Sequence, residues 1–199
     1  MRKTLVISSS VAILFLGSCS PRDFLTRRLA ADLIKGADAF RTQQRFQFRT
    51  GIVSNEDYLS PDYLVLQHRG WISGAKASCP RSLAPPPCWD VMLTPSGVDT
   101  FQSLIAPGNA EKQSFSLPTA RRELVAVTGI AKQGNVADVE FTWRWSPLNE
   151  VGAALYPSGV RYRSTTTLRR YDDGWRIAQT AARLSQPLDE ALKDAQPAQ

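Results

Sequence analysis

Strict alternation of apolar and polar side chains over residues 136–146 is the feature that most restricts the fold of this chain. The apolar members are Ala137, Val139, Phe141, Trp143 and Trp145, and the polar members between them are Asp138, Glu140, Thr142 and Arg144. Side chains of a β-strand point alternately to its two faces, so this pattern predicts a strand with one apolar and one charged face. Other elements must cover the apolar face.

Three more extended runs accompany this strand, at residues 124–132, 160–171 and 175–181. The segments that separate the runs are Gln133-Gly134-Asn135, a longer stretch over 147–159, and Asp172-Asp173-Gly174. Short connections of this composition join neighbouring antiparallel strands. The second half of the chain is therefore predicted to form an antiparallel β-meander.

The first half supplies helices that can cover the sheet. Ser20 and Pro21 are typical of a helix start, with Asp23 in the first turn, and Gly36 is a typical stop. Between them lies an apolar stripe at helical spacing, made of Leu25, Leu29, Ala30, Leu33 and Ile34. This stripe predicts an amphipathic helix whose apolar side packs on the sheet.

A helix, a hairpin and a second helix are predicted within residues 56–106, after a short strand over 46–52. The signals are Ser60-Pro61-Asp62 and Gly70 for the first helix, extended runs at 71–77 and 89–93 for the hairpin, and Thr94-Pro95 for the second helix. The predicted fold class is α+β: an antiparallel meander covered on one face by helices, with a helix-hairpin-helix insertion.

The amino-terminal segment has the composition of an export signal. Two basic residues precede an apolar run over 5–16, which no charged residue interrupts. This run is much shorter than the roughly 20 apolar residues of a spanning helix. Gly17 and Ser18 are the small residues that a signal peptidase requires. Residues 1–18 are therefore predicted to be a signal peptide.

The sequence Leu16-Gly17-Ser18-Cys19 resembles the lipobox of bacterial lipoproteins. The resemblance implies diacylation of the Cys19 thiol, cleavage before Cys19 and acylation of the freed amine with fatty acids such as palmitate. Two or more acyl chains anchor a protein stably. Ser20 is not the aspartate that retains such proteins in the inner membrane of enteric bacteria. We therefore expect an outer-membrane lipoprotein facing the periplasm, with a tether at 19–22.

Cys79 and Cys88 remain as a pair once Cys19 is acylated. An oxidising compartment favours a disulfide between them, which would hold the proline-rich loop that they enclose. A metal or redox site is the alternative, but the spacing is not C-x-x-C and no histidine lies nearby. The insertion is therefore predicted to be pinned by a disulfide.

The charge of the mature chain argues against a nucleic-acid partner. Without residues 1–18, the chain has 22 basic and 18 acidic side chains, a net charge of +4. Nucleic-acid binders usually carry a denser basic patch, whereas weak attraction to anionic lipid headgroups is compatible with this value.

Residues able to carry catalysis are few. His68 is the only histidine, which excludes an H-E-x-x-H zinc site, and its place near a helix end indicates a surface residue. The adjacent acids do not face each other across a cleft, as glycosidase carboxyl groups must. These pairs are Glu56-Asp57, Asp172-Asp173 and Asp189-Glu190. No catalytic residue, metal or cofactor is predicted.

Arginines crowd the last three strands: Arg144, Arg161, Arg163, Arg169, Arg170 and Arg176. Those on the outward face would form a basic stripe for a carboxylate-rich or phosphate-rich partner, unless they are simply solvated or paired with acids. Trp71 and Trp89 flank the predicted disulfide hairpin and would form an aromatic contact site there or belong to a minor core.

A helix followed by a long meander ending in the residues 168–177 (LRRYDDGWRI) loosely resembles the cystatin-like and nuclear-transport-factor-like folds over the C-terminal half. The resemblance implies a pocket between the sheet and its helices. Residues 23–186 are expected to form a single domain, and residues 187–199 a frayed helix or tail.

We expect a non-enzymatic, lipid-anchored lipoprotein that binds or supports another component of the cell envelope. The alternative is an envelope hydrolase or a small-ligand-binding protein whose pocket contains Glu140. Strand alternation directs Glu140 outward instead, where Arg161, Arg163 or Arg169 would pair with it.

Overall fold

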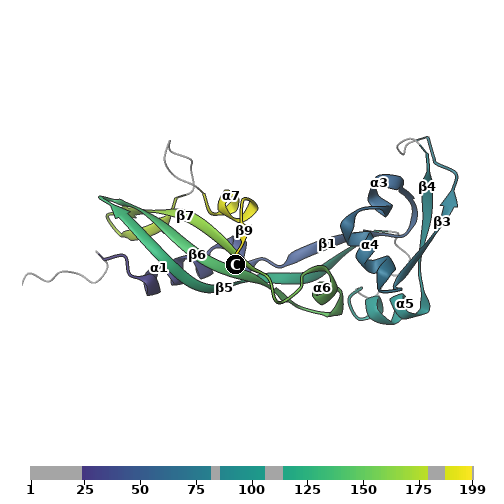
Figure 1. The fold of residues 1–199 in the computed structure, drawn as a ribbon, viewed down its shortest axis with the longest axis horizontal. Helices are drawn as coiled ribbons and strands as arrows, with labels where there is room; N and C mark the ends of the chain where they lie inside the picture. The colour runs from purple at the N-terminus through teal and green to yellow at the C-terminus, as the bar shows by residue number, and fades with distance from the viewer. Residues whose placement is uncertain (1–23, 82–85, 106–113, 179–186, 199) are drawn as a thin grey trace, which may run out of the picture.

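The structure, a computed structural model, describes residues 24–81, 86–105, 114–178 and 187–198. Two sheets lie toward opposite ends of an elongated α+β molecule (Figure 1). The six-stranded sheet contains β1 (Gln44–Arg49), β5 (Ser114–Gln133), β6 (Val136–Pro147), β7 (Arg161–Tyr171), β8 (Gly174–Ile177) and β9 (Gln196–Pro197). The three-stranded sheet contains β2 (Gly51–Ser54), β3 (Ile72–Ala77) and β4 (Cys88–Leu93).

The antiparallel meander of the second half is confirmed, because β5, β6, β7 and β8 pair in that order. In β6 the apolar positions 137, 139, 141 and 143 are buried, as the alternation predicts. β5 begins ten residues earlier than the predicted run at 124. Its 20 residues correspond to a length of up to about 65 Å at the rise of an extended strand. This strand therefore links the two ends of the molecule.

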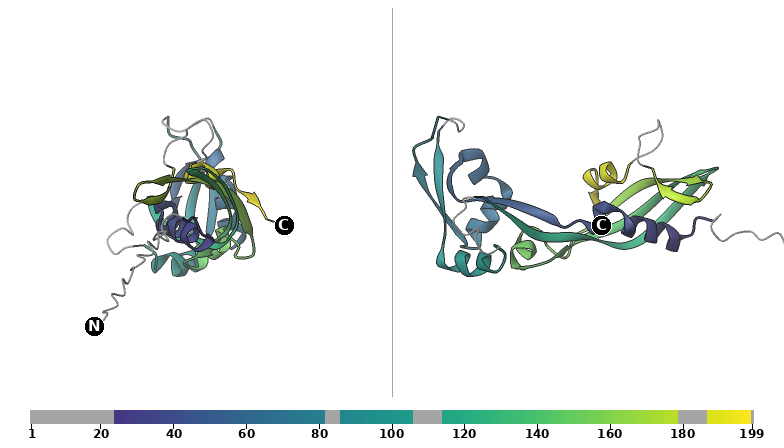
Figure 2. Two further views of the ribbon diagram at one scale, coloured as in Figure 1. Left: turned by 90° about the vertical axis from the view of Figure 1, so that its left-hand side faces the viewer. Right: turned by 180° about the vertical axis from the view of Figure 1, so that it is seen from behind.

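The sheet curls around α1 (Arg27–Gly36), which lies along its concave side, as the end-on view in Figure 2 shows. Ala30 and Ile34 are fully buried against the sheet, so the predicted stripe is its packing face. The described helix begins after Thr26, whose hydroxyl oxygen accepts a hydrogen bond from the Leu29 amide (3.1 Å). The start predicted at residues 20–23 lies outside the described residues.

A hydrophobic core on the concave side of the sheet packs the helices against strands β5 to β8. Phe40 of α2 (Asp38–Arg41) contacts Phe141 edge-on, with ring centroids 6.2 Å apart. The other buried members include Leu124, Val139, Trp143, Leu168 and Trp175. Helices thus cover one face of the meander, and the opposite face is open to solvent.

Residues 51–105, as far as these are described, form the far end of the molecule, here called the head (Figure 1). Its core also includes Phe48 of β1 and Phe115 of β5. The single strand expected over 46–52 is two strands, because the chain turns at Gly51 (φ 77°) and passes from one sheet to the other. The helices of the head are α3 (Asn55–Tyr58), α4 (Pro61–His68) and α5 (Pro95–Gln102). The helix-hairpin-helix order is therefore confirmed.

The start and stop signals of the head helices act as predicted. Ser60 occupies the N-cap position of α4 without a side-chain capping hydrogen bond, Pro61 is the first helical residue, and Gly70 after the helix end has φ 69°. The Thr94 hydroxyl accepts a hydrogen bond from the Gly97 amide (3.1 Å) at the start of α5. A disulfide joins Cys79 to Cys88, with the Cα atoms 5.2 Å apart, and this confirms the predicted crosslink of the hairpin.

Two segments expected to be irregular contain packed helices. The connection 147–159 includes α6 (Glu150–Leu155), in which Val151 is fully buried. Residues 187–198, expected to be a tail, contain α7 (Leu188–Lys193) and β9, which pairs with β7. Leu188, Ala191 and Leu192 form one apolar stripe at helical spacing and are buried. The C-terminal segment is therefore part of the folded domain.

Across the described ranges, no helix is both long enough and apolar enough to cross a bilayer.

Candidate functional site

The outer face of the six-stranded sheet, opposite α1, carries the candidate site. Side chains on this face of β5 to β8 include six arginines and three acids. They are Arg121, Arg144, Arg161, Arg163, Arg169 and Arg176, with Glu123, Asp138 and Glu140. Arg170 is not among them, because it lies opposite the buried Trp175 and shares the inner face with it. Most of the predicted stripe is therefore brought together.

One row of the outer face runs across three strands. Glu123 of β5 lies opposite Arg144 of β6, which lies opposite Arg161 of β7. The Arg144 Nε donates a hydrogen bond to the Glu123 carboxylate at 3.0 Å. This hydrogen bond holds the pKa of Glu123 below its ordinary value and raises the pKa of Arg144. Arg161 forms no ion pair within the described part of the chain.

Glu140 points outward, as its position in β6 predicts. Its carboxylate lies 3.3 Å from the Arg163 Nε, and 40% of its side chain is exposed. Thr165 is its direct neighbour on β7, so the ion pair is diagonal across the two strands. The predicted pairing of Glu140 with an arginine is confirmed, and the residue does not lie in a pocket beneath the sheet.

A second row places two arginines opposite each other near the tip of the sheet. Arg169 of β7 faces Arg176 of β8. Arg176 forms an ion pair with Asp173 of the hairpin turn. The Arg169 Nε is buried and has no hydrogen-bond acceptor among the residues described.

The outer face therefore contains two pairs of like charges in direct cross-strand positions, Arg144 with Arg161 and Arg169 with Arg176. Like charges placed directly opposite each other on a sheet are destabilising. An oxyanion bound between two such guanidinium groups removes the repulsion. Guanidinium groups bind carboxylate and phosphate through two parallel hydrogen bonds. The geometry thus favours a ligand with repeated oxyanions.

Trp71 and Trp89 belong to the core of the head, which corrects the expectation of an aromatic contact site. Trp71 is 4% exposed and contacts Phe101 edge-on, with centroids 6.2 Å apart. Trp89 is partly buried, stacks on Tyr58 at 4.4 Å and donates its indole N–H to the side-chain Oδ1 of Asn55 (2.9 Å). Both rings therefore make contacts within the head: Trp71 packs in the core, and Trp89 stacks on Tyr58 and donates a hydrogen bond.

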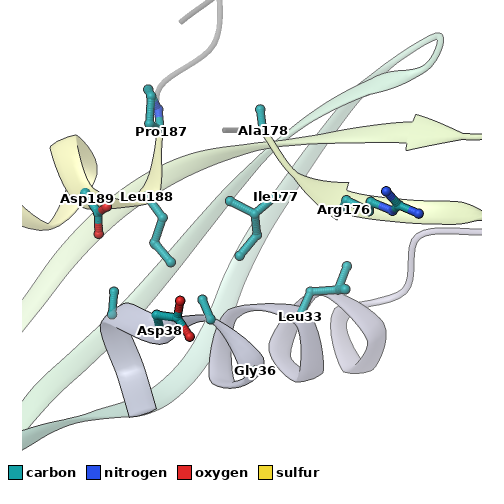
Figure 3. Close-up of a pocket in the computed structure, with 11 residues that line it drawn as sticks. Leu33, Gly36, Asp38, Arg176, Ile177, Ala178, Pro187, Leu188 and Asp189 are labelled. Carbon is teal, nitrogen blue, oxygen red and sulfur yellow. The ribbon is translucent and has the colours of Figure 1, made fainter. Parts of the chain in front are cut away.

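A cavity of about 500 Å³ opens between α1 and α2 on one side and β8 and α7 on the other (Figure 3). Leu33, Ile177 and Leu188 give it apolar walls, and Asp38, Asp189 and Arg176 are its charged members. A pocket between the sheet and its helices was expected, but not that α7 forms one wall of it, because residues 187–199 were expected to be a frayed helix or tail.

Sequence reasoning also missed Arg122, a partly buried cation on the inner face. Its guanidinium lies over the rings of Trp143 (5.5 Å) and Trp145 (4.7 Å), and its Nη1 donates to the Ala39 carbonyl oxygen at 3.0 Å. Burial lowers the pKa of Arg122, and the nearby Asp189 carboxylate opposes this effect. Extending the alternation back from Leu124 would have placed Arg122 on this face. The hydrogen bond from Arg122 to Ala39 therefore connects β5 of the sheet to α2.

Among the described residues, no group of three or more His, Cys, Asp or Glu side chains is arranged to hold a metal ion. Cys19 and the other residues of the predicted lipobox lie outside the described residues. No protein family, no curated protein and no solved structure matches this chain.

Proposed function

We propose that this protein is a lipid-anchored envelope lipoprotein that binds another envelope component through the arginines of its outer face and has no catalytic role. The direct opposition of Arg144 and Arg161 is the observation that carries the binding proposal. Two cations held side by side on a rigid sheet favour a partner that presents carboxylate or phosphate groups at matching spacing. The resemblance of residues 16–19 to a lipobox supports the anchor.

The anchor would hold the molecule in a defined direction. Seven residues separate Cys19 from Arg27 of α1, so that segment reaches roughly 25–30 Å when fully extended. The six-stranded sheet would then lie close to the bilayer, and the head would point away from it (Figure 1). In this arrangement the outer face of the sheet lies near the membrane surface. A neighbouring envelope component would approach this face from the side of the molecule.

Two measurements test the proposal in intact cells. The first follows incorporation of a labelled fatty acid, which Cys19→Ser should abolish. The second places a photo-crosslinking residue at Thr165, which is exposed on the outer face opposite Glu140, and a control at Glu190, which is exposed on α7. The natively acylated protein should capture a discrete partner from position 165 and not from position 190.

Arginine variants complete this test. The double change Arg144→Gln and Arg161→Gln should remove the captured partner. A matched double change in the head, Arg69→Gln and Arg81→Gln, removes two exposed arginines elsewhere and should leave capture intact. Equal capture by both double variants would exclude the outer face as the binding surface.

A second candidate function, binding of a small molecule, is supported by the cavity between α1, β8 and α7. Glu140 has no part in it, because this residue lies on the opposite face of the sheet and pairs with Arg163. The cavity therefore supports binding and offers no role for Glu140 as a catalytic acid.

A further inference from the structure

We propose that the cavity between α1, β8 and α7 binds an apolar molecule that carries a primary ammonium group. This inference rests on the second candidate function and names its ligand class. The cavity lies on the opposite side of the sheet from the row Glu123, Arg144 and Arg161. Arg176 is the residue that the cavity lining shares with the outer face.

The cavity has the size of a small-molecule site and several apolar side chains in its lining. Its volume of about 500 Å³ falls within the roughly 300–1,000 Å³ that is typical of ligand pockets. Leu33 comes from α1, Ile177 from β8 and Leu188 from α7, and the close-up shows these side chains directed toward one space (Figure 3). An apolar ligand body placed there would be removed from water on several sides.

The charges of the cavity are distributed unevenly. Asp38 of α2 and Asp189 of α7 come from opposing walls at one end, and Arg176 lies toward the other end (Figure 3). Neither carboxylate forms an ion pair within the described part of the chain. An ammonium group has three N–H donors, so it can donate to both carboxylates while its apolar chain lies along the walls.

Of the described residues that line the cavity, the charged ones at this end are the two acids. Arg122 is close enough to attract Asp189, but its Nη1 donates to the Ala39 carbonyl oxygen. Arg122 thus offsets part of one of the two negative charges. At the other end, Arg176 already pairs with Asp173 and its side chain is 61% exposed. An anionic ligand would have to compete with Asp173, whereas a cationic one meets two acceptors.

The test uses calorimetric titration of the acylated protein in neutral phosphatidylcholine nanodiscs, with empty nanodiscs as the blank. The probes are hexylamine, hexanol and hexanoate, which share one chain length and differ in head group. Hexylamine should bind at least tenfold more tightly than hexanol, hexanoate should bind least, and the preference for the amine should fall as salt is added.

Variants locate the site. The double change Asp38→Asn and Asp189→Asn should abolish the preference for hexylamine and leave hexanol binding unchanged. Asp32→Asn, an exposed change on α1 outside the cavity, is the matched control. Gly36→Leu should weaken all three probes, because Gly36 lines the cavity and a Cβ there meets no atom within 4 Å. Thermal unfolding of each variant verifies that it is folded.

The outcomes distinguish failure of the proposed ammonium site from failure of the small-molecule function on which it rests. Equal binding of hexylamine and hexanol would overturn the proposed ammonium site and retain a cavity that binds apolar molecules. Tightest binding of hexanoate would also overturn it and assign the site to Arg176. Failure of all three probes to bind at millimolar concentration would overturn both the inference and the small-molecule function.

Discussion

Arg144 of β6 and Arg161 of β7 lie directly opposite each other on the solvent-exposed face of the sheet. Glu123 neutralises Arg144 from the other side, through a 3.0 Å hydrogen bond, and Arg161 has no ion-pair partner within the described chain. This row is the centre of the proposed binding face. A sheet that retains such a repulsive pair is less stable than one with a neutral residue at either position.

Replacing Arg161 with threonine should therefore stabilise the isolated protein while it weakens partner binding. The midpoint of thermal unfolding should rise by about 1–2 °C, because one repulsive cross-strand pair is removed and threonine suits a strand. Differential scanning calorimetry at low salt measures the change. A lower midpoint in the variant would mean that Arg161 stabilises the fold, which contradicts a binding role.

The Glu123–Arg144 ion pair predicts a pH dependence. The hydrogen bond from Arg144 lowers the pKa of Glu123 below the value of 4.5 that is expected in the unfolded chain. The stability it contributes is therefore fully present above about pH 5 and is lost as the pH falls through the lower folded-state pKa. Both side chains are exposed, so the effect is small and salt reduces it.

Glu123→Gln provides the measurement of this dependence. The difference in unfolding midpoint between the wild type and this variant should be constant from about pH 5 to pH 7 and should shrink progressively as the pH falls below 4.5. A difference that grows as the pH falls would show that the carboxylate is destabilising in the folded state, and this would contradict the ion pair.

Gly152 of α6 should tolerate no side chain. A Cβ at this position would lie 1.8 Å from the Thr119 carbonyl oxygen, which belongs to the backbone of β5. Gly152→Ala should therefore lower the free energy of unfolding by about 3 kcal/mol or more. The control is Gly36→Ala at the end of α1, where a Cβ meets no atom within 4 Å and about 0.5 kcal/mol of stabilisation is expected. Urea denaturation of both variants measures the contrast, and similar values for the two would contradict the close approach of α6 to β5.

Arg122 should stabilise the fold through its shape as well as its charge. Arg122→Ala removes the contacts with Trp143 and Trp145 and the hydrogen bond to Ala39, and it should cost about 2 kcal/mol. Arg122→Lys keeps the charge and loses the planar stacking, so it should recover only about half of this loss. Urea denaturation followed by tryptophan fluorescence measures both. Full recovery by lysine would show that the planar group is unimportant.

The sequence predicted those parts of the fold that depend on local patterns. Alternation in β6 located the sheet and placed Glu140 outward, and Ser60, Gly70 and Thr94 marked helix ends correctly. These signals depend on interactions between residues that are close in the chain. They act through side-chain direction, capping and the φ angle of glycine. They need no knowledge of what packs against the segment.

Features that depend on distant contacts were missed. The first half of β5 was not predicted, because the register shift opposite Gln44 and Arg45 interrupts the period of two, and the consecutive residues Thr119 and Ala120 are both buried. Leu188, Ala191 and Leu192 are buried only because the sheet lies beneath α7, so a six-residue helix looked like a tail. A pocket between the sheet and its helices was expected from the fold resemblance, but the wall formed by α7 depends on that same packing and was not predicted. Trp71 could not be assigned to a core rather than to a contact site, because its partner Phe101 is thirty residues away in the chain.

The most direct test of the account is charge reversal on the outer face, read by crosslinking from position 165 in intact cells. Changing Arg144 and Arg161 to glutamate should reduce the yield of the captured partner at least tenfold. The same reversal at Arg69 and Arg81 in the head should leave the yield unchanged. An undiminished yield from the folded Arg144→Glu, Arg161→Glu protein would contradict the proposal that these arginines bind the envelope component.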